Sequence, residues 1–235
     1  MLNARRPRAT PRHQSGLSMV ELLVGVAVGL FVVAGATMAV SNQLGDNRRL
    51  MLETQIQQDL RAAADVIARD LRRSGYWAQA QDGVWHPGAV WPLPTNPYNR
   101  PVDNAYEVMP AASSVASDIE FGYSRGAIEN VATDKAGFRL SGNAIQMNVG
   151  GTWQALTDST TLRITDFRVT VLRQDVPLAC FNPCPVGATT CPPTQTVRDV
   201  RVEISGVAVH DPSVQRSARS QVRLRNDVIN GACPA

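Results

Sequence analysis

The sequence predicts an α+β protein in which a long N-terminal helix is packed on an antiparallel β-sheet. Three patterns in the 235 residues support this class. An uncharged apolar run comes first, and a stretch in which apolar residues recur every three or four positions follows it. Segments with strand patterning then succeed one another with no helix between them. Strands that do not alternate with helices are typical of an antiparallel sheet covered on one face.

The apolar run explains why only 18% of the residues are charged. Residues 22–45 contain no charged side chain, and the densest part, residues 22–40, is 19 residues long. As a helix this part spans roughly 28 Å, close to the hydrocarbon thickness of a bilayer. We therefore expect residues 17–40 to form a membrane-spanning helix. The arginines that precede the run predict a cytoplasmic N-terminus and a C-terminal part on the other side of the membrane.

Residues 41–75 are expected to continue the helix in amphipathic form. The apolar positions at spacings of three and four are Leu52, Ile56, Leu60, Ala63 or Ala64, Ile67 and Leu71. The opposite face carries acids and arginines mixed in sign, which is typical of a solvated surface and not of a nucleic-acid site. Gly75, after Arg72 and Arg73, is the predicted end of the helix.

The remaining residues, 76–235, are expected to form a β-rich globular domain. Residues 76–110 are rich in proline and aromatic residues, which favours an ordered loop packed on a sheet over a recognition surface. Gly206 is a candidate bulge. The predicted strands are Asp118–Ser124, Phe138–Leu140, Ala144–Val149, Thr161–Leu172, Val197–Val209 and Ser220–Arg225.

The net charge of +3 comes from the first 16 residues. This segment holds Arg5, Arg6, Arg8 and Arg12 and no acid, so the other 219 residues carry a net charge of −1. If the segment is removed on maturation, the basic surplus is removed with it. The composition therefore gives no support for a nucleic-acid partner.

Glu21 is the unusual residue of the N-terminal region, because a carboxylate at the mouth of an apolar helix is costly in lipid and is by default a functional candidate. It lies in residues 16–24, GLSMVELLV. This stretch resembles the cleavage and methylation motif of type IV prepilins. Two further stretches, residues 69–77 and 222–227, resemble PilW-type minor pilins.

The resemblance implies a pilin-like fold and a role in assembly. Residues 1–16 are then a cytoplasmic leader, a prepilin peptidase cleaves after Gly16, and Leu17 becomes the N-methylated N-terminus, although the family prefers Phe at that position. Glu21 becomes the carboxylate that acts between subunits in the filament. The implied partners are the peptidase, other minor and major pilins, the inner-membrane assembly platform and, before assembly, the lipid bilayer. The domain is then periplasmic, and the function is to initiate or cap a pilus used for twitching motility, adhesion or DNA uptake.

Two other functions remain as alternatives. A pseudopilin of type II secretion has the same N-terminus and a similar plan. A membrane-anchored periplasmic hydrolase is a remote alternative, because residues 122–126, GYSRG, match G-x-S-x-G with His210 downstream. The strand, sharp turn and helix that this motif needs are not indicated, so we expect no catalytic residue and no enzyme activity.

Four cysteines, Cys180, Cys184, Cys191 and Cys233, lie in the last quarter of the chain. An even number of cysteines in an exported domain predicts two disulfides, and three connectivities are possible. A zinc cluster is disfavoured, because the paired C-x2-C spacing of structural zinc sites is missing. The resemblance implies one bond from residues 180–191 to Cys233 and one bond within that loop. No metal site, nucleotide site or other cofactor is expected.

Overall fold

The computed structural model describes residues 16, 18–84, 87–88, 90, 92–99 and 106–234. The chain divides into two compact units, Met1–Arg49 and Leu50–Ala235. The second unit holds all the strands and the hydrophobic core.

Helix α1, Met19–Leu71, is 53 residues long and contains both the apolar run and the amphipathic stretch of the sequence. Up to Leu50 its residues are exposed, and from Ile56 to Leu71 one face is buried. The helix ends four residues before Gly75, which has a φ of +72° and whose N–H donates to the carbonyl of Gly122 at 2.8 Å. Glycine adopts this left-handed conformation without steric cost, so the chain turns there.

One antiparallel sheet consists of β2 (Asp118–Gly122), β3 (Lys135–Ser141), β4 (Ala144–Val149) and β5 (Thr152–Ala155), in that order. Gly142 and Asn143 both have positive φ and form the two-residue turn between β3 and β4, as a tight hairpin requires. A short helix, α2 (Val131–Asp134), precedes β3 and is capped by the side chain of Asn130.

The second antiparallel sheet has the order β1-β6-β7-β8, with β9 also paired to β7. The five strands are β1 (Val115–Ala116), β6 (Leu162–Pro177), β7 (Thr194–Ala208), β8 (Gln215–Arg223) and β9 (Val228–Asn230). The register of β6 on β7 shifts between Ile164 and Asp166, directly opposite Gly206. The bulge predicted at Gly206 therefore lies in the partner strand. A Cβ at Gly206 would come within 2.7 Å of Leu162 Cδ1, so this position needs glycine for packing.

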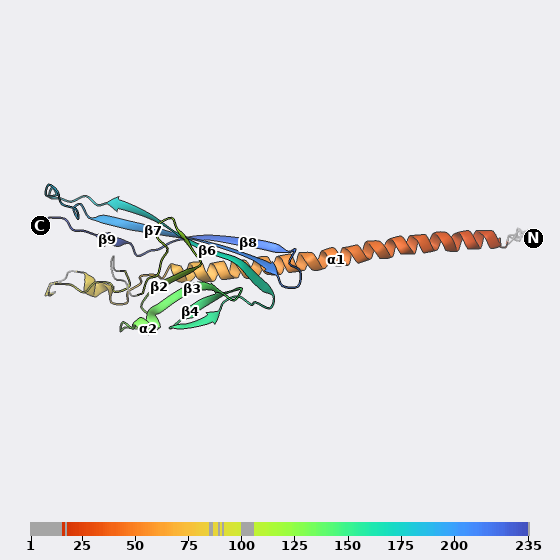
Figure 1. The fold of residues 1–235 in the computed structure, drawn as a ribbon, viewed down its shortest axis with the longest axis horizontal. Helices are drawn as coiled ribbons and strands as arrows, with labels where there is room; N and C mark the ends of the chain where they lie inside the picture. The colour runs from red at the N-terminus through yellow and green to blue at the C-terminus, as the bar shows by residue number, and fades with distance from the viewer. Residues whose placement is uncertain are drawn as a thin grey trace, which may run out of the picture. The chain divides into compact units, whose positions relative to one another are not determined.

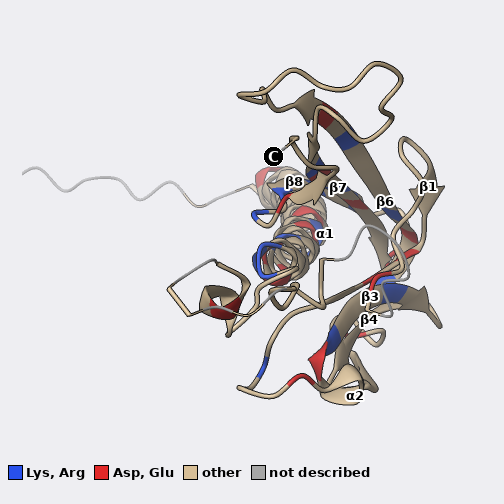
Figure 2. Ribbon diagram, turned by 90° about the vertical axis from the view of Figure 1, so that its left-hand side faces the viewer, with Lys and Arg blue, Asp and Glu red and all other residues tan. Residues whose placement is uncertain are grey.

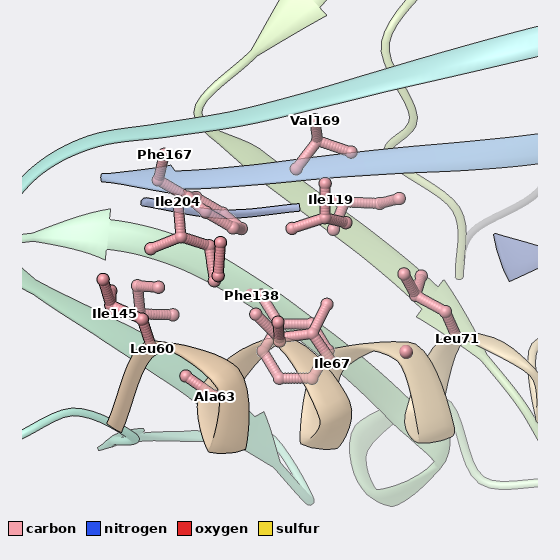
Figure 3. Packing of buried hydrophobic residues seen from close by; sticks show 14 of the residues in the cluster. Leu60, Ala63, Ile67, Leu71, Ile119, Phe138, Ile145, Phe167, Val169 and Ile204 are labelled. Carbon is pink, nitrogen blue, oxygen red and sulfur yellow. The ribbon is translucent and has the colours of Figure 1, made fainter. Parts of the chain in front are cut away.

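Both sheets and the second half of α1 share one core (Figures 1 and 3). Leu60, Ile67 and Leu71 of the helix face the sheet residues Phe138 and Ile204. Viewed along α1, the two sheets lie around the helix (Figure 2). Burying side chains of this size contributes about 1.5–3 kcal/mol each, so the predicted amphipathic face is what fixes the helix to the domain.

The α+β prediction is confirmed, with differences in the shorter elements. Strands β1, β5 and β9 and helix α2 were not predicted, since each has four residues or fewer. A short 3-10 helix, η1 (Ala80–Gly83), lies in the proline-rich segment. In that segment Tyr98 and Tyr106 are buried, whereas Trp85 and Trp91 lie outside the described residues.

Candidate processing and assembly site

The candidate processing site lies directly before α1. Gly16 is exposed, and Leu17 lies outside the described residues. The carbonyl of Ser18 accepts a hydrogen bond from the Leu22 N–H at 3.0 Å, so the helical pattern begins within two residues of the expected cleavage point. A peptidase can reach an exposed glycine before a helix more easily than a peptide bond within one, because helical backbone is held by its own hydrogen bonds.

Glu21 lies in the first turn of α1 and is exposed. The free N–H groups of a helix N-terminus favour a negative charge at this position. The next charged residue along the helix is Asp46, so Glu21 is isolated from other charges by 24 uncharged positions. Residues 22–45 of this helix therefore offer no cationic partner for the carboxylate.

The apolar part of α1 presents large hydrophobic side chains on every side. Leu22, Phe31 and Val33 are all more than half exposed. Among the described residues, α1 is the one helix that is long and apolar enough to cross a bilayer. An exposed apolar surface all round a helix is stable in lipid or in a bundle of similar helices, and not in water.

Small residues make this helix suitable for close packing. At Gly25, Gly29 and Gly35, no atom of the described residues outside the adjacent turns of the same helix lies within 4 Å of where a Cβ would stand. Gly25 and Gly29 form the G-x-x-x-G spacing that lets two helix backbones approach. Their surface is available to a neighbouring helix.

Ser124 of the G-x-S-x-G string is buried in a polar network in the globular unit. Its Oγ accepts a hydrogen bond from the Ala78 N–H at 3.0 Å and donates to the Tyr98 hydroxyl at 3.4 Å. It follows β2 in an irregular segment and is not at the start of a helix. His210 is exposed in the turn between β7 and β8, and it is not among these partners of Ser124. These hydrogen bonds fasten Ser124 to Ala78 and Tyr98.

The same network holds Asp134, which sequence reasoning did not single out. The Tyr98 hydroxyl donates to Asp134 at 2.6 Å, and burial together with this bond raises the pKa of Tyr98 to about 12. Burial alone would raise the pKa of Asp134, but hydrogen bonds from Tyr98 and from the amides of Asn130 and Arg125 hold that pKa below its ordinary value. Asp134 is thus an ionised, buried carboxylate that fixes the loop containing Tyr98.

A second buried cluster is centred on Arg198 of β7. Its guanidinium donates to Glu107 at 2.8 Å, to Asn99 Oδ1 at 2.8 Å and to the carbonyl of Asn226 at 3.3 Å. These residues lie far apart in the sequence, so no local pattern indicated the cluster. It attaches parts of the proline-rich segment to the sheet, which agrees with the expected packed loop.

All four cysteines lie in the described part of the chain, and all are paired. Cys180 is bonded to Cys233 and Cys184 to Cys191. One bond therefore reaches the C-terminal segment, and the other closes within the loop between β6 and β7. The thiols of Cys180, Cys184 and Cys191 lie within 4.8 Å of one another, but as disulfides their sulfurs are not thiolate ligands.

Comparison with known families gives two matches. The family described as "Prepilin peptidase-dependent protein B" matches residues 49–224, and the "Prokaryotic N-terminal methylation motif" matches residues 11–37. The first match covers the second half of α1 and nearly all the strands, and the second covers the candidate processing site. No curated protein and no solved structure matches the chain.

Proposed function

Because the chain belongs to the prepilin peptidase-dependent protein B family, we propose that this pilin-like protein is a minor pilin of a type IV pilus. Prepilin peptidase is a partner of such a protein. On our proposal the peptidase cleaves after Gly16 and methylates Leu17. The processed chain then enters the pilus through its N-terminal helix and helps to initiate or cap assembly.

The observation that carries this proposal is the position of the motif relative to the helix. Exposed Gly16 is followed by a helix whose apolar half is exposed on all sides, with one carboxylate, Glu21, near its start. This arrangement is consistent with membrane anchoring and with later packing among similar helices. On the proposal, residues 1–16 lie in the cytoplasm and the globular unit lies in the periplasm.

The amino-terminal residue of the protein tests the processing step. When the full-length gene is expressed, the protein extracted from membranes should begin at Leu17, because the peptidase recognises the junction at Gly16. Its mass should exceed that of the unmodified chain from Leu17 by one methyl group. A Gly16→Leu variant should retain the leader, whereas Gly25→Ala, a matched change inside the helix, should be processed normally. These masses are measured by intact-protein and N-terminal peptide mass spectrometry. A wild-type chain that keeps Met1, or is cut elsewhere, contradicts the proposal.

A type II secretion pseudopilin is the alternative, and a deletion strain separates the two functions. Loss of this protein should reduce surface pili and leave the export of type II substrates unchanged. The opposite result, intact pili with impaired secretion, assigns the chain to the secretion system. A plasmid copy of the gene restores the phenotype in either case and serves as the control.

A further inference from the structure

Strand β8 is the last strand of the larger sheet, and its ladder with β7 shows which backbone groups remain open. The Leu224 N–H donates to the carbonyl of Arg198 at 2.9 Å, and the Ala208 N–H donates to the carbonyl of Val214 at 3.0 Å. In an antiparallel ladder the bonded pairs alternate with unbonded ones. With Val200 opposite Val222, the even-numbered residues of β8 therefore bond to β7.

The odd-numbered residues consequently turn their N–H and C=O groups away from β7. These are Ser217, Arg219, Gln221 and Arg223, and the side chains of all four are exposed. Among the described residues, no backbone hydrogen bond joins Ser217, Arg219 or Gln221 to another element on this side. The open edge extends over roughly 20 Å, the length of a seven-residue strand. Figure 2 shows β8 at this edge, with β7 on its other side.

The edge also carries exposed arginines. Residues 212–226 contain four arginines and no acid, with Asp211 and Asp227 directly outside this stretch. The side chain of Arg219 is 76% exposed and that of Arg223, which pairs with Asp227 at 3.0 Å, is 59% exposed. Arg201 of β7 lies exposed in the neighbouring row. Glu203 contacts Arg219 through Nε, at 3.3 Å, and a guanidinium has five N–H donors, so Arg219 has the capacity to bind a further carboxylate.

We propose that this β8 edge binds an extended, acidic segment of a partner protein, which adds to the sheet as one more strand. The open N–H and C=O groups supply main-chain hydrogen bonds, as in other cases of strand addition. Acidic side chains at every second position face Arg219 and Arg223, because cross-strand neighbours of opposite charge stabilise a pair.

The charge argues against a second copy of this chain as the partner. Two β8 edges that pair antiparallel about Gln221 place Arg219 opposite Arg223 twice, and like charges in that position are destabilising. The arginines thus select against self-association and for an acidic strand.

A hollow in the surface of the domain borders the start of β8. Arg216 points inward there and pairs with Glu53 of α1. Beside this pair is a hollow of about 360 Å³, lined by Gln57, Ser205, Gln215, Arg216 and Ser217.

A blocked synthetic peptide of seven residues, with Asp at every second position and Val or Thr between, is the probe. It is titrated into the full chain in detergent micelles, and amide hydrogen exchange of β8 is followed by NMR. The amides of Arg219 and Gln221 should exchange at least ten-fold more slowly with the peptide, while Ser220 and Val222, already bonded to β7, change little. A peptide with Lys in place of Asp should give no protection.

Gln221→Pro is the decisive variant, because it removes one outward N–H and no bond to β7. Proline is tolerated on an edge strand where its nitrogen faces solvent. Peptide affinity should fall at least ten-fold in Gln221→Pro and stay within two-fold in the matched Gln221→Ala. In a second variant, Arg219→Glu, the acidic peptide should lose affinity and the lysine peptide should gain it.

Three results would overturn the proposal. The first is an amide exchange rate of Arg219 that stays unchanged up to millimolar acidic peptide. The second is peptide affinity that survives both Gln221→Pro and Arg219→Glu. The third is slowed exchange of the β8 amides by a single-stranded oligonucleotide in place of the peptide. A dimer of the full chain that Gln221→Pro abolishes and Gln221→Ala does not would instead assign the edge to a second copy. None of these results depends on cleavage after Gly16, so this proposal and the pilin function succeed or fail separately.

Discussion

Asp134 accepts hydrogen bonds from the Tyr98 hydroxyl and from the amides of Asn130 and Arg125, and it is buried. A buried carboxylate is stable only when its oxygens are bonded, since desolvating an unpaired charge costs several kcal/mol. At the scale of single residues, this carboxylate and Arg198 hold loops that have little apolar area of their own.

The Asp134→Asn variant should lower the free energy of unfolding by about 1.5–3 kcal/mol at neutral pH, because it weakens hydrogen bonds to a charged group. The folded-state pKa of Asp134 is below its unfolded value. Its contribution is therefore present above the unfolded pKa and is lost as the pH falls through the folded one. Thermal unfolding of the full chain in detergent, followed by near-UV circular dichroism, measures both effects.

The free energy of unfolding at acid pH distinguishes the Asp134→Asn variant from the wild type. Below a pH of about 4 the wild type should lose stability more steeply than Asp134→Asn, so that the two curves approach each other. Asp158, an exposed carboxylate whose pKa is also lowered, by hydrogen bonds from Thr160, provides the matched control. Asp158→Asn should change stability little. Parallel curves for wild type and Asp134→Asn would contradict the assigned role.

At the scale of elements, the long loop between β6 and β7 depends on its disulfides. Residues 176–197 contain no charged side chain, and Phe181 and Val186 in this loop are fully exposed. The loop contributes no side chain to the core cluster. Covalent bonds therefore hold a segment that apolar burial does not hold.

The two disulfides should differ in their effect on stability. Replacing Cys180 and Cys233 by Ser opens a loop of 53 residues and should cost about 4 kcal/mol, whereas the same change at Cys184 and Cys191 opens one of 7 residues and should cost about 2 kcal/mol. Each pair is the control for the other in urea unfolding of the full chain in detergent. Equal losses would show that loop length does not set the contribution.

At the scale of the whole molecule, α1 has two parts that require different surroundings. From Met19 to Val40 all sides are apolar and exposed, and from Ile56 to Leu71 one side is buried in the domain. The first part requires lipid or neighbouring helices, and the second part carries the domain. Glu21 is the one charge in the first part, and on the proposed function its partner sets how neighbouring subunits are aligned.

Glu21→Ala should leave cleavage after Gly16 intact and lower the amount of this protein in sheared filaments about ten-fold or more. The physical reason is that the new N-terminal amine of one chain loses the carboxylate that compensates its burial, and breaking such a pair is strongly destabilising. Asp46→Ala, an exposed acid of the same helix beyond the apolar run, is the control and should assemble normally. Immunoblots of filament and membrane fractions measure this. Normal incorporation of Glu21→Ala would refute the role.

The sequence by itself determined the apolar helix, its amphipathic continuation, the processing motif and most of the longer strands. Each of these is a local pattern, because helix and strand periods repeat over neighbouring residues. The short strands β1, β5 and β9 were missed, since two to four residues are too few to show a period. The G-x-S-x-G string is a local match for which the sequence shows no supporting strand, turn and helix, and in the fold its Ser124 hydrogen-bonds to Ala78 and Tyr98.

Only the tertiary structure decided how the strands divide into two sheets, which edge of β8 stays open and where Arg198 and Asp134 find their partners. Arg198 and Glu107 are 91 positions apart, and Tyr98 and Asp134 are 36 apart. No periodicity extends over such distances. Their pairing depends on the chain closing around the buried face of α1, which brings distant segments together and makes an unpaired charge too costly.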